Sequence, residues 1–350
     1  MNFLGIDIGF GTTDILIIFN EKIFKMVLPT RGQQLAQQVI NYQGDIYIGG
    51  IEMGGNPLAG ALKTKLQEGF RIYITKEAAK TINYDLNKVK EKGFEIISEK
   101  KFESVSDQDG LIIQTADFLP DILNKFLLTQ GIEYNFDIIG IAVQDHGKAE
   151  GSSTQFRGFW IQKQLEKDPV FDSFLFSELQ VPPYLLRMRT IIEYFREFYP
   201  KSRIYVMDTV FAAIQGAIYS QPFEKNLISM DIGNGHTAAA THSRGEIYGY
   251  FEFHTSAITP SRLEWAIEKL VQGNLTNEEI WQKGGHGALT RKPCPNSFPI
   301  LVTGPHRQLI TQTHLPYSFA NPLGDMMITG CVGLALGIEK REKIKILKSI

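Results

Sequence analysis

Two stretches of this sequence share one pattern: Asp7-Ile8-Gly9-Phe10-Gly11-Thr12-Thr13 near the start and Asp231-Ile232-Gly233-Asn234-Gly235-His236-Thr237 in the second half. Each stretch follows a β-branched apolar run, which predicts a buried strand that ends at the aspartate. The glycines that come next predict a hairpin turn whose N–H groups an anion can approach closely, because no Cβ stands in the way. Either turn alone is equally consistent with an ordinary hairpin. A copy in each half favours two phosphate-binding loops.

The composition is that of a globular chain with enough apolar residues for a core, since 43% of its 350 residues are hydrophobic and 21% are charged. A chain of this length predicts roughly two domains. Its net charge of −2 provides no field to hold nucleic acid or an anionic membrane. Neither is therefore an expected partner.

The cysteine content excludes two further classes of protein. Cys294 and Cys331 are too few for a disulfide framework or a four-thiolate metal site, and they fit a reducing compartment. A cytoplasmic location is therefore expected. The apolar start of the chain lacks a basic segment and carries Asp7 and Asp14, so it is interpreted as folded structure and not as a signal sequence. No other stretch approaches the roughly 20 apolar residues that span a bilayer.

Hydrophobic periodicity and the repeated turn predict an α/β chain in two lobes. The first lobe is expected to cover residues 1–207, with an inserted subdomain at about 49–115, and the second lobe residues 208–350. The expected strands lie at 3–8, 14–19, 22–27, 136–143, 203–207, 227–232 and 299–302, and the expected helices at 56–68, 116–130, 185–198, 208–219, 260–272, 277–283 and 324–337.

The paired turns suit a nucleotide, because two facing loops can hold its β- and γ-phosphates from both sides. Asp7 and Asp231 supply hard oxygen ligands for Mg²⁺ at the ends of the two strands. ATP and Mg²⁺ are the expected cofactors. The residues expected to contact the nucleotide through these turns are Gly9, Gly11, Thr12, Thr13, Gly233, Asn234, Gly235, His236 and Thr237.

Five segments follow one another along the chain: a glycine turn with its aspartates at 7–14, a helix rich in small residues at 208–216, a second glycine turn at 231–237, a loop at 300–307 and a second helix rich in small residues at 329–337. Their order resembles the superfamily of actin, heat-shock chaperones and sugar kinases. In that resemblance they are a first phosphate loop, a connecting helix, a second phosphate loop, an adenosine loop and a second connecting helix. The resemblance implies a two-lobed actin-like ATPase fold with duplicated ribonuclease-H-like lobes and a nucleotide between them.

In that resemblance Gly304 and Arg307 belong to the adenosine loop. The loop departs from the superfamily pattern, because Pro305 and His306 stand where further glycines are usual. The choice between adenine and another base is therefore left open.

A closer resemblance is to an uncharacterised branch of the superfamily that is often labelled as related to the pyruvate formate-lyase activating enzyme. The residues that carry it are Met53-Gly-Gly-Asn-Pro57, Gln144-Asp-His-Gly147, Phe253-His-Thr255, Gly284-Gly-His-Gly-Ala288 and Gly304-Pro-His-Arg307. The label itself conflicts with the composition, because a radical enzyme of that type needs three closely spaced cysteines for its iron–sulfur cluster.

Asp208 is the expected catalytic residue. It opens the first connecting helix, and in carbohydrate kinases that resemble this pattern the corresponding aspartate takes the proton of the substrate hydroxyl. In the chaperones, an acid there helps to position water and metal. An ordinary helix N-cap is the alternative interpretation of Asp208.

A second group of residues is expected to contact the substrate. Glycines before a helix can present N–H groups to an anion, or can simply form a turn. Histidines in turns can contact phosphate or hydroxyl groups. Their spacing is not that of a helical zinc motif, which disfavours a dedicated transition-metal centre. The expected substrate residues are Gly54, Gly55, Gln144, Asp145, His146, His254 and His286.

These observations predict a Mg-ATP-dependent phosphotransferase that acts on a small hydroxylated acceptor. The alternative is an ATPase switch that uses the same nucleotide site to activate or remodel a partner protein or enzyme.

Overall fold

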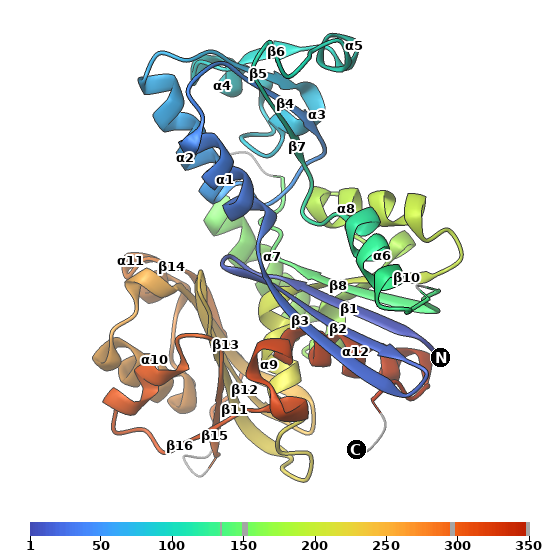
Figure 1. Cartoon of the computed structure of the whole chain (residues 1–350). Helices are drawn as coiled ribbons and strands as arrows, with labels where there is room; N and C mark the ends of the chain where they lie inside the picture. The colour runs from blue at the N-terminus through green and yellow to red at the C-terminus, as the bar shows by residue number, and fades with distance from the viewer. Residues whose placement is uncertain (134, 149–152, 295–297, 348–350) are drawn as a thin grey trace. The chain divides into compact units, whose positions relative to one another are not determined.

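The computed structural model describes residues 1–133, 135–148, 153–294 and 298–347 (Figure 1). The chain forms two compact units. One unit contains Met1–Leu28, Asn135–Ile192 and Tyr199–Ile350, and the other contains Pro29–Tyr134 and Glu193–Phe198.

The first sheet of the larger unit has the strand order β3-β2-β1-β8-β10-β9. Strand β1 pairs antiparallel with β2 and parallel with β8, which in turn pairs parallel with β10. Strand β8 has the sequence Ile-Ile-Gly-Ile-Ala-Val and is buried throughout, as expected of a parallel strand that is covered on both faces. The bounds are β1 Phe3–Ile8, β2 Thr12–Phe19, β3 Lys22–Pro29, β8 Ile138–Val143, β9 Leu175–Ser177 and β10 Arg203–Asp208.

The second sheet has the order β14-β13-β12-β11-β15-β16. Strands β11, β12, β13 and β14 form an antiparallel meander, while β15 pairs parallel with β11 and with β16. The bounds are β11 Asn226–Ile232, β12 His236–Ser243, β13 Glu246–His254, β14 Gly285–Thr290, β15 Ile300–Thr303 and β16 Tyr317–Phe319.

The two sheets repeat one topology. In each sheet, three consecutive strands lie side by side, and two later strands extend the sheet beyond the first of the three. The orders are β3-β2-β1-β8-β10 and β13-β12-β11-β15-β16. This duplication confirms the predicted fold class, an α/β chain of the two-lobed actin-like kind with an additional subdomain.

Two helices rich in small residues correspond to the two expected connecting helices, and they pack against each other in the larger unit. They are α9, Thr209–Ile218, and α12, Thr329–Glu342. A Cβ on Gly216 would lie 1.8 Å from the carbonyl oxygen of Thr329, and one on Gly333 would lie 1.9 Å from that of Ala212. Only glycine permits this close crossing.

Further helices belong to the larger unit, and one of them, α8, extends into the smaller unit. Helix α7 was not predicted, because no periodic signal was recognised between residues 148 and 184. The bounds are α7 Ser153–Lys167, α8 Leu186–Phe198, α10 Pro260–Gln272 and α11 Asn277–Gln282, with short 3₁₀ helices at Phe171–Phe174, Glu178–Gln180, Thr255–Ala257, Arg307–Gln312, Pro322–Gly324 and Met326–Ile328.

The smaller unit has its own parallel sheet, in the order β6-β5-β4-β7, and its own core around Ile46, Ile48, Leu62 and Ile74. The bounds are α1 Arg31–Asn41, β4 Ile46–Gly50, α2 Asn56–Gln67, β5 Ile72–Thr75, α3 Lys76–Ala79, α4 Leu86–Glu91, β6 Glu95–Ile97, α5 Glu99–Glu103, β7 Leu111–Thr115 and α6 Pro120–Thr129.

The bounds of the units differ from those predicted. The inserted subdomain was expected at about 49–115, whereas the smaller unit begins at Pro29 and also takes in the end of helix α8. The larger unit contains residues on both sides of position 207, so the division into lobes at 207/208 stays a prediction. None of the helices in the described ranges combines the length and the apolar character needed to cross a membrane.

Candidate functional site

The two predicted phosphate loops are hairpins with the same hydrogen bond. The N–H of Gly9 donates to the carbonyl oxygen of Thr12 at 2.9 Å, and the N–H of Gly233 donates to that of His236 at 2.9 Å. The strand registers match as well, because Ile8 pairs with Thr13 and Ile232 pairs with Thr237. The sequence repeat is therefore a structural repeat.

The tips of the two hairpins lie against each other within the larger unit. A Cβ on Gly11 would be 2.3 Å from Nδ2 of Asn234, and a Cβ on Gly235 would be 2.9 Å from Cβ of Phe10. Side chains at these two glycines would separate the loops. The structure thus brings together two groups of residues that are far apart in the sequence, as predicted.

Asp7 and Asp231 lie at the bases of the hairpins and are close enough to repel each other. Burial raises the pKa of Asp7 to about 7, although the hydrogen bond that Oγ1 of Thr209 donates to it at 2.5 Å acts to lower this pKa. Burial and the charge of Asp7 raise the pKa of Asp231 to about 7, and burial and Asp7 raise that of Asp14 to about 8. Grouped carboxylates of this kind fit a hard divalent cation such as Mg²⁺, which would offset their mutual repulsion.

The predicted adenosine loop follows β15 and packs on the second phosphate loop. Gly304 has φ +96, and a Cβ there would lie 2.4 Å from the carbonyl oxygen of Ile232. Nη1 of Arg307 donates to the carbonyl oxygen of Ala320 at 3.1 Å, and its guanidinium lies 4.9 Å from the ring centre of Phe319. The N–H of His306 donates to the carbonyl oxygen of Ile232 at 3.0 Å, so a backbone hydrogen bond holds the loop next to Asp231.

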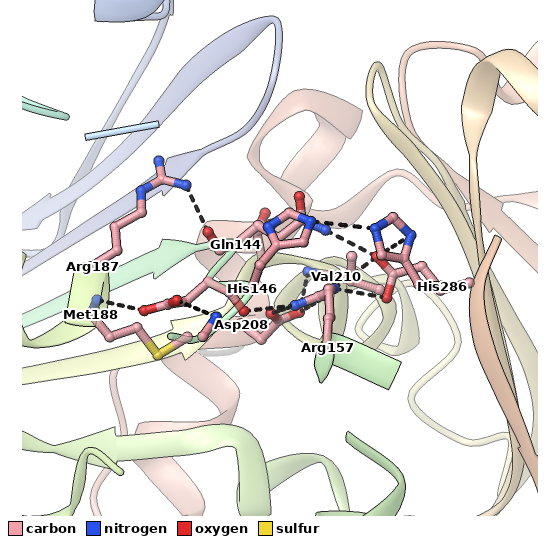
Figure 2. A network of polar contacts seen from close by, with 12 residues as sticks. Gln144, His146, Arg157, Arg187, Met188, Asp208, Val210 and His286 are labelled. Carbon is pink, nitrogen blue, oxygen red and sulfur yellow. Dashed lines mark hydrogen bonds and ion pairs between the residues drawn. The ribbon is translucent and has the colours of Figure 1, made fainter. Parts of the chain in front are cut away.

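Asp208 has partners that the sequence did not indicate (Figure 2). Its carboxylate accepts two hydrogen bonds from Arg157, at 2.6 Å from Nη1 and 3.0 Å from Nη2, and both side chains are 0% exposed. It also caps α9 by accepting from the N–H of Val210 at 3.1 Å, so the N-cap interpretation is correct. Burial raises the pKa of Asp208, and the Arg157 guanidinium opposes that rise.

Glu252 on β13 is the second carboxylate of this buried network. Nε of Arg157 lies 3.0 and 3.1 Å from its two oxygens, and Nε2 of Gln144 donates to it at 2.9 Å. The hydroxyl of Tyr250 donates to it at 2.6 Å. Burial acts to raise the pKa of Glu252, but Arg157 and the neighbouring histidines hold it below its ordinary value.

The Gln144–Gly147 turn at the end of β8 is fixed by one of its own residues, Asp145. Its carboxylate accepts from the N–H groups of Gly147 at 2.8 Å and Met188 at 3.1 Å. The Gln144 carbonyl oxygen accepts from Nη1 of Arg187 at 2.7 Å. Asp145 therefore has a structural role in positioning the turn, and Gln144 and His146 project from it (Figure 2).

Four of the predicted residues form a cluster of histidines. The Nε2 atoms of His146 and His286 are 3.3 Å apart, and His236 has ring-centre distances of 6.2 Å to His146 and 4.7 Å to His286. The ring of His254 lies 4.4 Å from that of His286. Burial lowers the pKa of His236 to about 3 and that of His286 to about 4, so these imidazoles are neutral at pH 7.

Gly54 and Gly55 belong to the smaller unit. The N–H of Gly54 donates to Oδ1 of Asp117 at 2.9 Å, and the N–H of Met53 donates to Oγ1 of Thr81 at 3.1 Å. Gly55 occupies the N-cap position of helix α2, which has no side-chain cap. Because the Gly54 amide already has an acceptor within its own unit, the turn interpretation accounts for it, and a substrate role for Gly54 and Gly55 stays a prediction.

Sequence reasoning missed Arg157 and Glu252. Both had a recognisable signal, since each is a charged residue among aromatic neighbours, in Phe156-Arg157-Gly158-Phe159-Trp160 and in Tyr250-Phe251-Glu252-Phe253. A charge in such a run is buried only when it is paired, which would have predicted an internal ion pair.

Most of the chain matches a known protein family. Residues 53–309 match the model described as "Putative pyruvate format-lyase activating enzyme (DUF1786)". The chain belongs to this family, as the resemblance implied. No curated protein matches the sequence with significance.

The residues do not fit the iron–sulfur cluster that the name of the family suggests, because two cysteines cannot supply three thiolates. Sγ of Cys331 donates to the carbonyl oxygen of Asp14 at 3.1 Å. Burial raises the pKa of both thiols, that of Cys294 to about 11.

Solved structures show distant likeness over nearly the whole chain. A protein with an actin-like ATPase fold and unknown function from Bacteroides thetaiotaomicron VPI-5482 is 10% identical, covers 95% of each chain and has a TM-score of 0.34. Component A of (R)-2-hydroxyglutaryl-CoA dehydratase from Acidaminococcus fermentans is 11% identical, with 98% of this chain and 99% of that chain covered and a TM-score of 0.32. A ROK hexokinase from Thermus thermophilus is 10% identical, with 98% and 99% covered and a TM-score of 0.33.

Proposed function

We propose that the chain binds a Mg-nucleotide, most simply ATP, at the two facing glycine hairpins and transfers its terminal phosphoryl group to a small hydroxylated acceptor. The observation that carries this proposal is the repeated hairpin with its buried aspartate, present once in each sheet and paired tip to tip. Two such loops offer backbone N–H groups to the phosphates from both sides.

Each part of the site has a role in this proposal. The N–H groups of Gly11 and Gly235 at the hairpin tips contact phosphate oxygens, and Asn234 moves aside to admit them. Gly9 and Gly233 form the hairpin hydrogen bonds that hold these tips in place. Asp7 and Asp231 hold the metal ion, which when bound neutralises charge on the phosphates. The Gly304–Arg307 loop, with the hydroxyls of Thr12, Thr13 and Thr237, completes the nucleotide site.

Asp208 has a conditional role in this proposal. The carboxylate is 0% exposed and paired with Arg157, so an acceptor hydroxyl reaches it only when Arg157 withdraws. Gln144, His146, His254 and His286 then lie on the acceptor side of the site.

The burial of Asp208 also supports a second candidate, an ATPase switch with water as the acceptor. In that case the Arg157–Asp208 pair is a permanent part of the larger unit, and hydrolysis is coupled to a change that a partner protein or enzyme recognises.

Calorimetry with Mg-ATP, Mg-ADP and Mg-GTP tests the shared part of both candidates. Binding is expected for the unmodified chain, with at least a tenfold weaker affinity for Asp231→Asn. The control is Asp137→Asn, an exposed acid that accepts from the N–H of Asn2. If the unmodified chain binds no nucleotide, both candidates are wrong.

An acceptor screen separates the two candidates. A kinase yields a phosphorylated polyol or hydroxy acid, and Asp208→Asn that remains folded retains nucleotide binding but loses turnover by several orders of magnitude. An ATPase switch releases phosphate slowly without any acceptor, at a rate that a partner increases.

A further inference from the structure

The three histidines His146, His236 and His286 come from three separate segments and direct ring nitrogens toward one point. His146 follows β8 of the first sheet, His236 opens β12 and His286 lies in β14 of the second sheet. Their ligand atoms all lie within 4.8 Å of one another, and Figure 2 shows His146 and His286 facing each other. We propose that these three imidazoles form a binding site for a divalent transition-metal ion.

The spacing of the nitrogens fits one ion. Zinc–nitrogen bonds of about 2.0 to 2.1 Å in a tetrahedral site place two ligand nitrogens about 3.3 to 3.4 Å apart. The Nε2 atoms of His146 and His286 are 3.3 Å apart. Rotation of the His236 ring brings its nitrogen within bonding distance of the same ion, because this nitrogen already lies within 4.8 Å of the other two.

Unsatisfied nitrogens in the cluster point to a missing ligand. Nε2 of His236 and Nδ1 of His286 are buried and have no hydrogen-bond partner among the residues that the structure describes. A buried polar atom without a partner costs about 1 to 3 kcal/mol, so such atoms are rare in folded proteins. A metal ion bound to His236 through Nε2 removes one of these deficits, because a metal bond replaces the hydrogen bond.

The charges around the cluster favour a cation. Arg157, Asp208 and Glu252 are all 0% exposed, so with both acids ionised this network carries one excess negative charge. Oε1 of Glu252 lies 3.7 Å from Nδ1 of His286. A carboxylate on the far nitrogen of a ligand histidine is the usual outer partner of a metal site, because it fixes the tautomer and the ring orientation.

The supports of the cluster hold it in place before any ion arrives. Gln144 and Tyr250 bind Glu252, and the carbonyl oxygen of His286 accepts from Nε1 of Trp281 at 2.8 Å. A Cβ on Gly158 would lie 2.2 Å from that same carbonyl oxygen, so α7 packs directly on the strand that carries His286. Rigid supports of this kind favour binding, because the ligand side chains need little further ordering when the ion binds.

The ligand type defines the class of metal. Neutral imidazoles suit zinc, copper, nickel and iron, whereas Mg²⁺ prefers oxygen ligands such as those of Asp7 and Asp231. Three protein ligands are the number found in open sites that keep a position for water or substrate. The histidine site is thus distinct from the predicted Mg²⁺ site, and it does not rest on the nucleotide proposal.

Metal uptake by the full chain tests the proposal. The protein is stripped with a chelator and titrated with Co²⁺, whose visible bands report tetrahedral nitrogen ligation, and Zn²⁺ competition and elemental analysis give the stoichiometry. One ion per chain is expected. Azide is expected to shift the Co²⁺ bands, because the fourth position is open.

Matched variants identify the ligands. His146→Ala and His236→Ala, whose side chains are not fully buried, are each expected to weaken binding at least a hundredfold, and Gln144→Ala about 10-fold to 100-fold through Glu252. The control is His314→Ala, since His314 is 95% exposed. Asp7→Asn is expected to leave Co²⁺ binding unchanged, which separates this site from the Mg²⁺ site.

Two results would overturn the proposal. One is the absence of stoichiometric uptake of Co²⁺ or Zn²⁺ by the stripped, folded chain. The other is uptake that persists in a His146→Ala, His236→Ala double variant whose circular dichroism spectrum shows it to be folded. A failure to bind nucleotide would leave both measurements valid.

Discussion

Arg157 joins two carboxylates that lie on different strands, and both ion pairs are shielded from water. Glu252→Gln leaves Arg157 paired with Asp208, so no buried charge is left unpaired, but a charged hydrogen-bond acceptor is lost. We therefore expect Glu252→Gln to lower the free energy of unfolding by roughly 1.5 to 3 kcal/mol in urea denaturation, because Arg157 and Tyr250 then lose their charged partner.

Glu246 on the same strand provides the control. It also forms ion pairs, with Arg291 and Lys292, but its side chain is 42% exposed. Exposed pairs contribute about 0 to 1 kcal/mol. If Glu246→Gln and Glu252→Gln cost the same, burial is not what makes the Arg157 network important.

The buried side chain of His242 makes the stability of the larger unit depend on pH. It is 2% exposed, its Nε2 lies 2.9 Å from Oγ of Ser229, and burial lowers its pKa to about 4. A depressed histidine pKa contributes stability above the unfolded pKa of about 6.5, and this is lost as the pH falls toward 4. The linkage is worth up to roughly 3 kcal/mol.

Denaturation at about pH 7 and about pH 4.5 measures this effect. Because His236 and His286 also have lowered pKa values, the informative quantity is the difference in the free energy of unfolding between the unmodified chain and His242→Gln. As the pH falls, the unmodified chain should lose more of this free energy than the variant does. Parallel pH profiles for the two proteins would show that His242 does not contribute.

Among the elements, the crossing of α9 and α12 depends most on particular glycines. A Cβ on Gly333 would lie 1.9 Å from a backbone oxygen of α9, which cannot rotate away as a side chain can. Gly333→Ala should therefore force the helices apart and cost at least about 1 to 3 kcal/mol, as overpacking does. The midpoint of thermal unfolding measures the loss.

Gly337, one turn further along α12, is the matched control. The nearest atom to a Cβ there is Cδ2 of Leu175 at 3.4 Å, an ordinary contact. Gly337→Ala should be neutral or stabilise by about 0.5 to 1 kcal/mol, because alanine loses less backbone entropy in a helix. An equal loss in both variants would indicate a propensity effect and not the crossing.

These elements also show what the sequence could predict. The hairpins and the two helices were recognisable because glycine, aspartate and small residues act locally, within a few positions of one another. The histidine cluster was not recognisable, because His146, His236 and His286 lie on separate segments that only the folded chain brings together. The expectation against a dedicated transition-metal centre was based on close spacing along one helix, and it stays untested. Such spacing gives no information on residues that come from three separate segments.

At the scale of the whole molecule, the extent of the inserted subdomain was underestimated for a similar reason. Helix α1 was not recognised, and residues 193–198 join the smaller unit from a distant part of the chain. Local pattern identifies an element, but which unit the element packs into depends on tertiary contacts.

The two units predict two unfolding events with different ligand dependence. The smaller unit has its own sheet and core, while both glycine hairpins belong to the larger unit. A ligand stabilises only the part of a protein that binds it, by about 2.7 kcal/mol when present at 100 times its Kd. Mg-ATP should therefore slow amide hydrogen exchange throughout β1, β11 and α9, and leave β4, β5 and α2 unchanged. Asp231→Asn should abolish the protection. Equal protection of both units, or the same protection from Mg²⁺-free ATP, would contradict a nucleotide site that is built from the two hairpins and their aspartates.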